Sequence, residues 1–225
     1  MNTYQTNGYS THQPIFIEIL KFTNGNILEC GCGDGSTVMI KDHIKDTNRK
    51  LVSLESNLNW LNKYTHLADL SHELYHIDAG NEDTLETGNT WVEFIKQKKL
   101  NDFDIVFLDS SPWLSRKCCF DYYLNKAKII IIHDFDYFPI HNIIGNVSNK
   151  ETTYYKGKRQ EKITCNLEGI VKNYRLFYPP DEYFFDLTGP PTLVCSNILD
   201  ESEFQELILT IELNMKSYYP SIDTL

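Results

Sequence analysis

A glycine-rich stretch between an expected strand and an expected helix restricts the fold of this chain more than any other feature. The segment Ile27-Leu28-Glu29-Cys30-Gly31-Cys32-Gly33-Asp34-Gly35-Ser36-Thr37 has glycine at alternate positions. Glycine lets the backbone turn sharply and lets a ligand approach the main chain closely. The segment lacks the Gly-Lys-Ser/Thr of a phosphate-binding loop. It therefore predicts a ligand-binding turn that opens an α/β domain.

The flanking sequence supports this prediction, because short apolar strands alternate with amphipathic helices. We expect strands over 26–30, 50–55, 73–77, 103–108 and 128–132, and helices over 14–22, 36–45, 57–67, 91–98 and 111–124. The run Ile129–Ile132 is unbroken and apolar, which is typical of a central strand buried on both faces. This alternation indicates a parallel sheet with helices on both sides, within one domain over 1–225.

The ends and the later part of the chain are less regular. Residues 1–11 are polar and are expected to form a flexible arm. Residues 134–166 show no clean period, and we expect an insert there that forms a lid over an acceptor site. Two late strands are expected over 175–178 and 192–197, and a terminal helix over 201–218.

Acidic residues follow the expected strands. Glu55 lies at the tip of the second strand, where a carboxylate can accept hydrogen bonds from two ribose hydroxyls. Asp78 and Asp109 follow the third and fourth strands. The glycine loop and Glu55 alone leave a nicotinamide cofactor and S-adenosylmethionine open. Glu29 beside the loop, Asp78 and Asp109 favour S-adenosylmethionine, whose sulfonium and adenine amino group suit carboxylates.

At this point the chain resembles the class I S-adenosylmethionine-dependent methyltransferases over about residues 12–200. The family's first motif is similar to the segment that begins at Glu29, and its ribose acid to Glu55. The resemblance implies a Rossmann-like, mostly parallel seven-stranded sheet with helices on both faces and a reversed last strand. The cofactor-binding residues it implies are Glu29, Gly31, Gly33, Asp34, Gly35, Ser36, Thr37, Glu55, Ser56, Asp78 and Asp109.

The acceptor side is expected around the fifth strand and the first helix. His133 follows the fifth strand, and histidine is suited to take the proton of an acceptor hydroxyl. We expect catalytic roles for His133, Asp134, Asp109 and His12, and substrate-binding roles for Arg116 and Tyr137. Ser10-Thr11-His12, Asp109-x-x-Pro112-x-x-x-Arg116 and His133-Asp134 also resemble motifs of a less characterised small-molecule and sugar O-methyltransferase-like subgroup.

A divalent metal is a further hypothesis from the resemblance. Some family members hold such an ion with acids after the fourth and fifth strands. Asp109, His133 and Asp134 are the candidate ligands for Mg²⁺ here, since this ion prefers oxygen ligands. The sequence departs from the catechol-methylating pattern, because the lysine three residues after Asp109 is absent.

Charge and composition limit the partners. The chain has 31 acidic and 21 basic residues among 225, a net charge of −10, which disfavours a general nucleic-acid surface. The locally basic stretch 154–162 leaves open the binding of a single phosphate group, and RNA methylation stays a weaker alternative. We expect a small-molecule acceptor such as a sugar or nucleotide sugar. Homo-oligomer formation stays open.

The cysteine pattern and the hydropathy of the chain indicate the cellular compartment in which we expect the protein. The spacing of the six cysteines suits reduced thiols rather than a disulfide framework. No apolar run is long enough to span a membrane, and no secretory leader is recognisable. We expect a cytoplasmic protein, in the host cytoplasm if it is viral, from an AT-rich genome.

Two other functions compete with methyl transfer. One is an NAD-dependent oxidoreductase on a Rossmann domain, although a second catalytic signature of such enzymes is not recognisable. The other is a non-catalytic module that keeps the cofactor pocket.

Overall fold

The computed structural model of the chain describes residues 10–155, 157–180 and 189–218. Seven strands form one sheet in the order β3-β2-β1-β4-β5-β9-β8. Their bounds are β1 (Ile27–Cys30), β2 (Leu51–Glu55), β3 (His72–His76), β4 (Ile105–Leu108), β5 (Ile129–Ile132), β8 (Asn173–Phe177) and β9 (Thr192–Ser196). The first five strands pair in parallel, and β9 runs antiparallel to both β5 and β8. The expected seven-stranded, mostly parallel sheet with a reversed last strand is confirmed.

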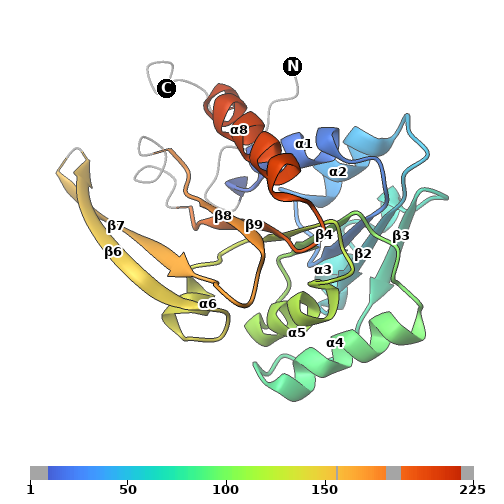
Figure 1. Ribbon diagram of the computed structural model, residues 1–225. Coiled ribbons are helices and arrows are strands. Elements are labelled where there is room, and N and C mark those ends of the chain that lie inside the picture. Colours follow the sequence, from blue (N-terminus) through green and yellow to red (C-terminus); the bar gives the residue numbers. More distant parts are fainter. Residues whose placement is uncertain (1–9, 156, 181–188, 219–225) are drawn as a thin grey trace.

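Helices cover both faces of the sheet (Figure 1). One face carries α1 (Gln13–Phe22), α2 (Thr37–Ile44) and α8 (Glu201–Tyr218), and the other carries α4 (Leu85–Gln97) and α5 (Trp113–Tyr123). Successive side chains of a strand point to opposite faces. In β4, Val106 packs into the core under α4 and α5, while Phe107 packs into the core under α1, α2 and α8. Both faces are thus apolar, as the continuous apolar strands predict.

Two helices differ clearly from the expected bounds, and one has the bounds expected. Helix α4 begins at Leu85 rather than at residue 91, because the Thr84 side chain caps it by accepting from the Thr87 backbone N–H at 3.1 Å. The helix expected over 57–67 is instead a short α3 (Leu58–Leu61) followed by a 3₁₀ turn, Thr65–Leu67. Helix α8 has the expected bounds, and its Phe204, Leu207, Ile208 and Ile211 form the buried stripe.

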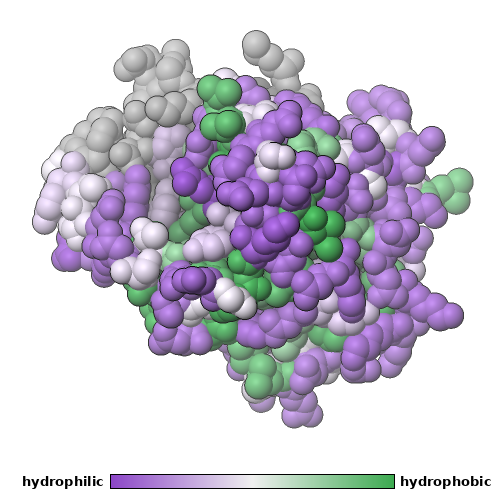
Figure 2. Space-filling model, viewed as in Figure 1, coloured by the Kyte–Doolittle hydropathy of each residue, from purple (hydrophilic) through white to green (hydrophobic). Residues whose placement is uncertain are grey.

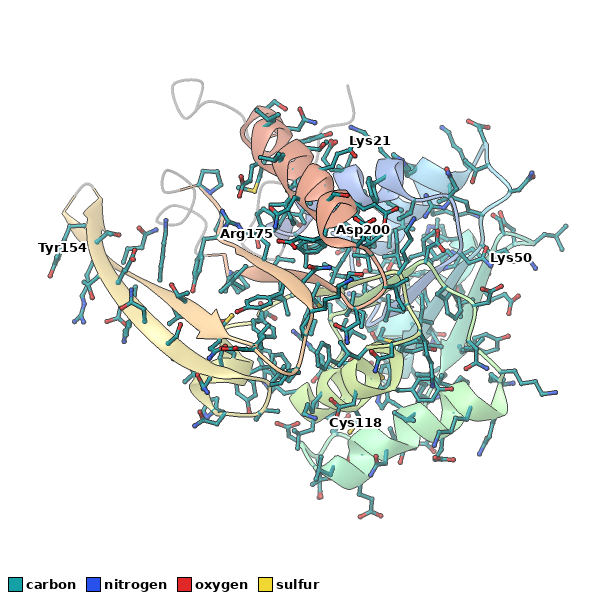
Figure 3. The ribbon with its side chains drawn as sticks, viewed as in Figure 1. Lys21, Lys50, Cys118, Tyr154, Arg175 and Asp200 are labelled. Atoms are coloured by element: carbon teal, nitrogen blue, oxygen red, sulfur yellow. The ribbon has the colours of Figure 1, made fainter. Side chains whose placement is uncertain are left out.

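A separate antiparallel hairpin is the main feature that the sequence did not predict. After a short α6 (Tyr137–Ile140), β6 (Asn146–Tyr155) pairs with β7 (Lys158–Asn166). The base of the hairpin is anchored, since Cys165 belongs to the core under α5 and the Ile163 N–H donates to the Tyr178 hydroxyl at 2.9 Å. The outer end projects from the molecule, and Tyr154 there is 72% exposed (Figure 3).

The described surface in Figure 2 is mostly hydrophilic and the cysteines are free, as the composition and the cysteine spacing predict. All six cysteines are free and buried. In the view of Figure 2, hydrophilic residues cover most of the described surface and apolar residues form small patches. Within the described residues, no helix has the length and apolar character needed to span a membrane.

Candidate functional site

The glycine loop connects the carboxyl end of β1 to α2, beside the ends of β2 and β4. Gly31 has φ +99°, a conformation that side chains rarely adopt. A Cβ atom at this position would lie 2.5 Å from the Asp109 carbonyl oxygen. The loop therefore needs glycine both for its turn and for its close contact with the segment after β4.

Glu29 lies beneath the loop and is fully buried. Its carboxylate accepts hydrogen bonds from the Thr37 hydroxyl at 3.0 and 3.1 Å and from the Ser53 hydroxyl at 2.6 Å. Ser53 stands opposite Glu29 in the β1–β2 register. Burial raises the pKa of Glu29 to about 7, against the effect of the hydroxyl donors. In this structure Glu29 ties the start of α2 to the sheet.

Glu55 lies at the tip of β2, as predicted. One of its oxygens accepts the Cys32 backbone N–H at 3.0 Å, and the other accepts the Asn57 N–H at 2.8 Å. Burial raises the pKa of Glu55, while these backbone donors oppose the rise. The carboxylate thus links the glycine loop to the turn after β2. Ser56 lies next to it and donates to the Ser111 carbonyl at 3.1 Å.

Two further predicted cofactor residues lie at the surface. Asp78 is exposed just beyond β3. Asp34 is exposed on the glycine loop, and the Tyr64 hydroxyl donates to it at 2.7 Å. Ser36 and Thr37, in contrast, are buried where α2 begins. Asp78 thus lies beyond β3, whereas the other three residues lie on the glycine loop or at the start of α2.

The segment just before α1 packs on the glycine loop. The Gln13 side chain donates to the Gly35 carbonyl at 2.7 Å. A Cβ atom at Gly35 would lie 2.9 Å from the Ser10 hydroxyl and 3.3 Å from the His12 ring. Ser10 and Thr11, at the end of the predicted arm, are buried, and residues 1–9 lie outside the described residues. This segment brings His12 to the site.

His133 is the centre of the predicted acceptor side and is almost fully buried. Its Nδ1 lies 3.4 Å from Asp109 and 3.6 Å from Asp134, and its Nε2 lies 3.2 Å from the Thr11 hydroxyl. The carboxylates favour the proton on Nδ1 in the neutral ring, which leaves the lone pair on Nε2. The neighbouring His12 ring packs edge-on against His133, with a centroid separation of 4.6 Å.

The two histidines have opposite pKa shifts. Burial and the charge of His133 lower the pKa of His12 to about 3. For His133, burial acts to lower the pKa, but Asp109 and Asp134 outweigh it and raise the pKa. Burial acts to raise the pKa of Asp109, yet His133 and Arg116 hold it below its usual range. His133 is therefore the stronger base, and His12 is neutral at pH 7.

Arg116 joins the ends of β4 and β5. Its guanidinium donates to the Ser110 carbonyl and to the His133 carbonyl, both at 2.7 Å. It also contacts Asp109 at 3.0 Å and Asp134 at 3.1 Å. The Arg116 side chain is only 7% exposed. The predicted role of Arg116 in gripping an acceptor stays a prediction, and the contacts shown are all within the chain.

Tyr137 belongs to an aromatic stack beside Arg116. Its ring stacks on Trp113 with a centroid separation of 4.3 Å, and its hydroxyl lies 3.5 Å from Asp83. Trp113 also packs edge-on against Phe138, and the Arg116 guanidinium lies 4.4 Å from the indole centroid. The stack supports Arg116 and is half-buried next to the predicted acceptor side.

The fit of a divalent ion depends on the donors present. Arg116 already lies between Asp109 and Asp134 and offsets one of their two negative charges, and this fixed positive charge does not fit Mg²⁺ bound by the predicted set of Asp109, His133 and Asp134. His12, Asp109 and His133 do place one possible ligand atom each within 4.8 Å of one another. Two imidazoles and one carboxylate are not the all-oxygen set that Mg²⁺ prefers.

Three residues of the site were not predicted. Thr11 contacts His133, Gln13 holds the glycine loop, and Ser53 holds Glu29. Thr11 and Gln13 flank His12 in the sequence, which was the available signal. Ser53 is two residues before Glu55, so strand alternation places the two side chains on the same face of β2.

The comparisons find proteins similar to this chain among solved structures. No family model matches the chain, and no curated protein matches it. The chain is similar to a solved structure described as a "putative S-adenosylmethionine dependent methyltransferase" from Listeria monocytogenes. The likeness covers 83% of this chain and 96% of that chain, with 12% sequence identity and a TM-score of 0.40. The Rossmann-like fold class follows from the strand order and directions described above.

Proposed function

We propose that this protein is an S-adenosylmethionine-dependent methyltransferase. The observation that carries the proposal is the juxtaposition of the glycine loop and Glu55 with the Asp109–His133 pair at neighbouring strand ends. In open α/β sheets, ligands bind outside the carboxyl ends of the strands. The exposed Asp78 and the loop backbone suit an adenosine and an amino-acid moiety. When bound, this cofactor supplies an electrophilic methyl group on a sulfonium.

The residues of the acceptor side suit methylation of a hydroxyl. The acceptor oxygen must lose its proton as it forms the bond to the methyl group. Asp109 orients His133 through Nδ1 and raises its basicity, so that Nε2 takes this proton. The Thr11 hydroxyl lies 3.2 Å from Nε2, so the acceptor oxygen would take the place of this hydroxyl at Nε2. His12 packs edge-on against His133 and stays uncharged, so it does not compete for the proton.

For the acceptor we propose a small molecule, with a sugar or nucleotide sugar as first choice. The net charge of −10 disfavours a long polyanion. The later part of the chain is also rich in tyrosine and phenylalanine, and sugar rings pack on such side chains. The choice of acceptor is tested by mass spectrometry of the products formed with a panel of sugars, nucleotide sugars and RNA. Methylation of RNA alone would contradict this choice of acceptor.

The cofactor is tested by calorimetric titration with S-adenosylhomocysteine and, separately, with NAD⁺. We expect binding of S-adenosylhomocysteine and none of NAD⁺; the reverse result would refute the methyltransferase assignment. His133→Gln should keep S-adenosylhomocysteine binding and lower turnover by about 100- to 10,000-fold, the usual contribution of a general base. Equal turnover in this variant would remove His133 from the mechanism.

A further inference from the structure

Paired carboxylates at the ends of adjacent strands need a positive charge between them. Asp109 follows β4 and Asp134 follows β5, and these two strands are neighbours in the sheet. Asp134 has φ +54°, a left-handed conformation that is strained for a residue with a side chain and that tends to occur at functional sites. Such a pair either binds a cation from solution or is neutralised by a side chain.

The structure provides that side chain. The Arg116 Nη2 atom lies 3.0 Å from the Asp109 carboxylate, and Nη1 lies 3.1 Å from the Asp134 carboxylate. The same guanidinium donates to the backbone carbonyls of Ser110 and His133 at 2.7 Å. Four contacts from one rigid planar group fix the distance between the two strand ends.

The guanidinium is also enclosed. Its side chain is 7% exposed, and the Trp113 indole covers it at 4.4 Å. Trp113 is held in turn by its stack on Tyr137. A divalent ion between the two carboxylates would lie beside a permanent positive charge that cannot deprotonate. The repulsion would be strong in this partly buried place.

We propose that Arg116 is the resident cation of this site: it pairs with both Asp109 and Asp134 where a divalent metal ion would otherwise bind, offsets one of their two negative charges, and positions His133 through its backbone carbonyl. The inference rests on the proposed function only where it assigns the site to methyl transfer. The contacts of Arg116 with the two carboxylates do not depend on that function. It implies that the protein transfers its methyl group without a metal. Arg116 is a positioning residue, because its contacts are with Asp109, Asp134 and His133.

The test uses Mn²⁺ as the probe, read by electron paramagnetic resonance on the full chain. The wild type should bind Mn²⁺ at this site at least about tenfold more weakly than Arg116→Ala, whose two carboxylates lose their counter-charge. Adding Asp134→Asn to Arg116→Ala should abolish the gained binding. Mn²⁺ should also raise the melting temperature of Arg116→Ala and leave that of the wild type unchanged.

Lys117→Ala is the matched control, since Lys117 is adjacent on α5 and pairs with Asp121 at the surface. It should bind no more Mn²⁺ than the wild type. Where Arg116→Ala fails to fold, Arg116→Gln removes the charge and keeps a donor for the carbonyls. Wild-type Mn²⁺ or Zn²⁺ binding that is lost in Asp109→Asn would overturn the proposal, as would no gain of Mn²⁺ binding in either folded Arg116 variant.

The outcome is separable from the proposed function. Mn²⁺ binding and melting need no methyl transfer, whereas S-adenosylhomocysteine titration reads the cofactor site alone. A protein that binds neither S-adenosylhomocysteine nor Mn²⁺ would refute the methyltransferase assignment and keep the role of Arg116. If turnover is found, chelation with EDTA should leave it unchanged, and loss of turnover restored by Mn²⁺ would refute metal independence.

Discussion

Glu29 should make the protein less stable as the pH rises from about 5 to 7. The carboxyl is fully buried, and burial raises its pKa from 4.5 to about 7. Below pH 4.5 the folded and unfolded states both hold the proton, so Glu29 adds no pH dependence there. Between these pH values the unfolded chain releases the proton and the folded chain keeps it, so stability falls. Above pH 7 the loss is complete and amounts to roughly 3 kcal/mol.

The assay is urea unfolding of the wild type and of Glu29→Gln at pH 5, 6, 7 and 8. Glutamine has nearly the same shape and still accepts from Thr37 and Ser53, but it cannot ionise. The difference in free energy of unfolding between the two proteins should shift by roughly 3 kcal/mol in favour of Glu29→Gln from pH 5 to pH 8. Titrating groups outside the hydrogen-bond network of Glu29 contribute equally to both proteins and cancel in this difference.

Glu86→Gln is the matched control, because Glu86 is exposed in the first turn of α4. Its free energy of unfolding should follow that of the wild type at every pH. Parallel pH profiles for the wild type and Glu29→Gln would refute the reasoning, since they would show that Glu29 ionises equally easily in both states. A difference of the opposite sign would mean that the Thr37 and Ser53 hydroxyls outweigh burial.

Three other outcomes follow from the same geometry. Gly31→Ala combines a left-handed backbone with a Cβ atom 2.5 Å from the Asp109 carbonyl, so urea unfolding should show a loss of roughly 3 kcal/mol; Gly80→Ala, at φ +74° with open space around it, should lose only about 1–2 kcal/mol, and equal losses would contradict the clash. Asp109→Asn should lower the pKa of His133, measured from its imidazole signals by NMR, because the first of the two charges that raise this pKa is gone; an unchanged pKa would assign the shift to Asp134. Methyl transfer in the wild type should rise with pH through a pKa above 6.5, since His133 must be neutral to accept a proton, and a rate that is flat from pH 6 to 8 would argue against His133 as the base.

Much of the sheet was predictable because its strands are apolar and regularly spaced. The observed Leu51–Glu55 and Ile129–Ile132 differ from the predicted strands by one residue at one end. The glycine loop and Glu55 were predictable because a strand–loop–helix unit fixes where a strand-end carboxylate must lie. Both features lie within short segments of the chain, so a single sequence is enough to predict them.

The hairpin and the contacts of Arg116 were not predictable for physical reasons. Strand β6 is exposed over 146–154, and the outer residues of β7 are polar. Neither segment has apolar alternation, and a strand without alternation resembles a loop. Arg116 was expected to face an acceptor. The orientation of the Arg116 side chain depends on how α5 packs against β4 and β5 and on the left-handed backbone at Asp134. Neither of these features produces a recognisable pattern in the sequence.

Because all six thiols are buried, their reaction with a thiol reagent reports local opening of the folded protein. Cys30, Cys119, Cys165 and Cys195 lie in the core under α4 and α5, whereas Cys32 lies in a small cluster beside the glycine loop. A thiol reagent reacts only with a cysteine that opening has exposed. Mass spectrometry of labelled peptides would therefore time the opening of the loop separately from that of the sheet, with no engineered label. Slower labelling of Cys32 in the presence of S-adenosylhomocysteine would locate the bound ligand at the glycine loop.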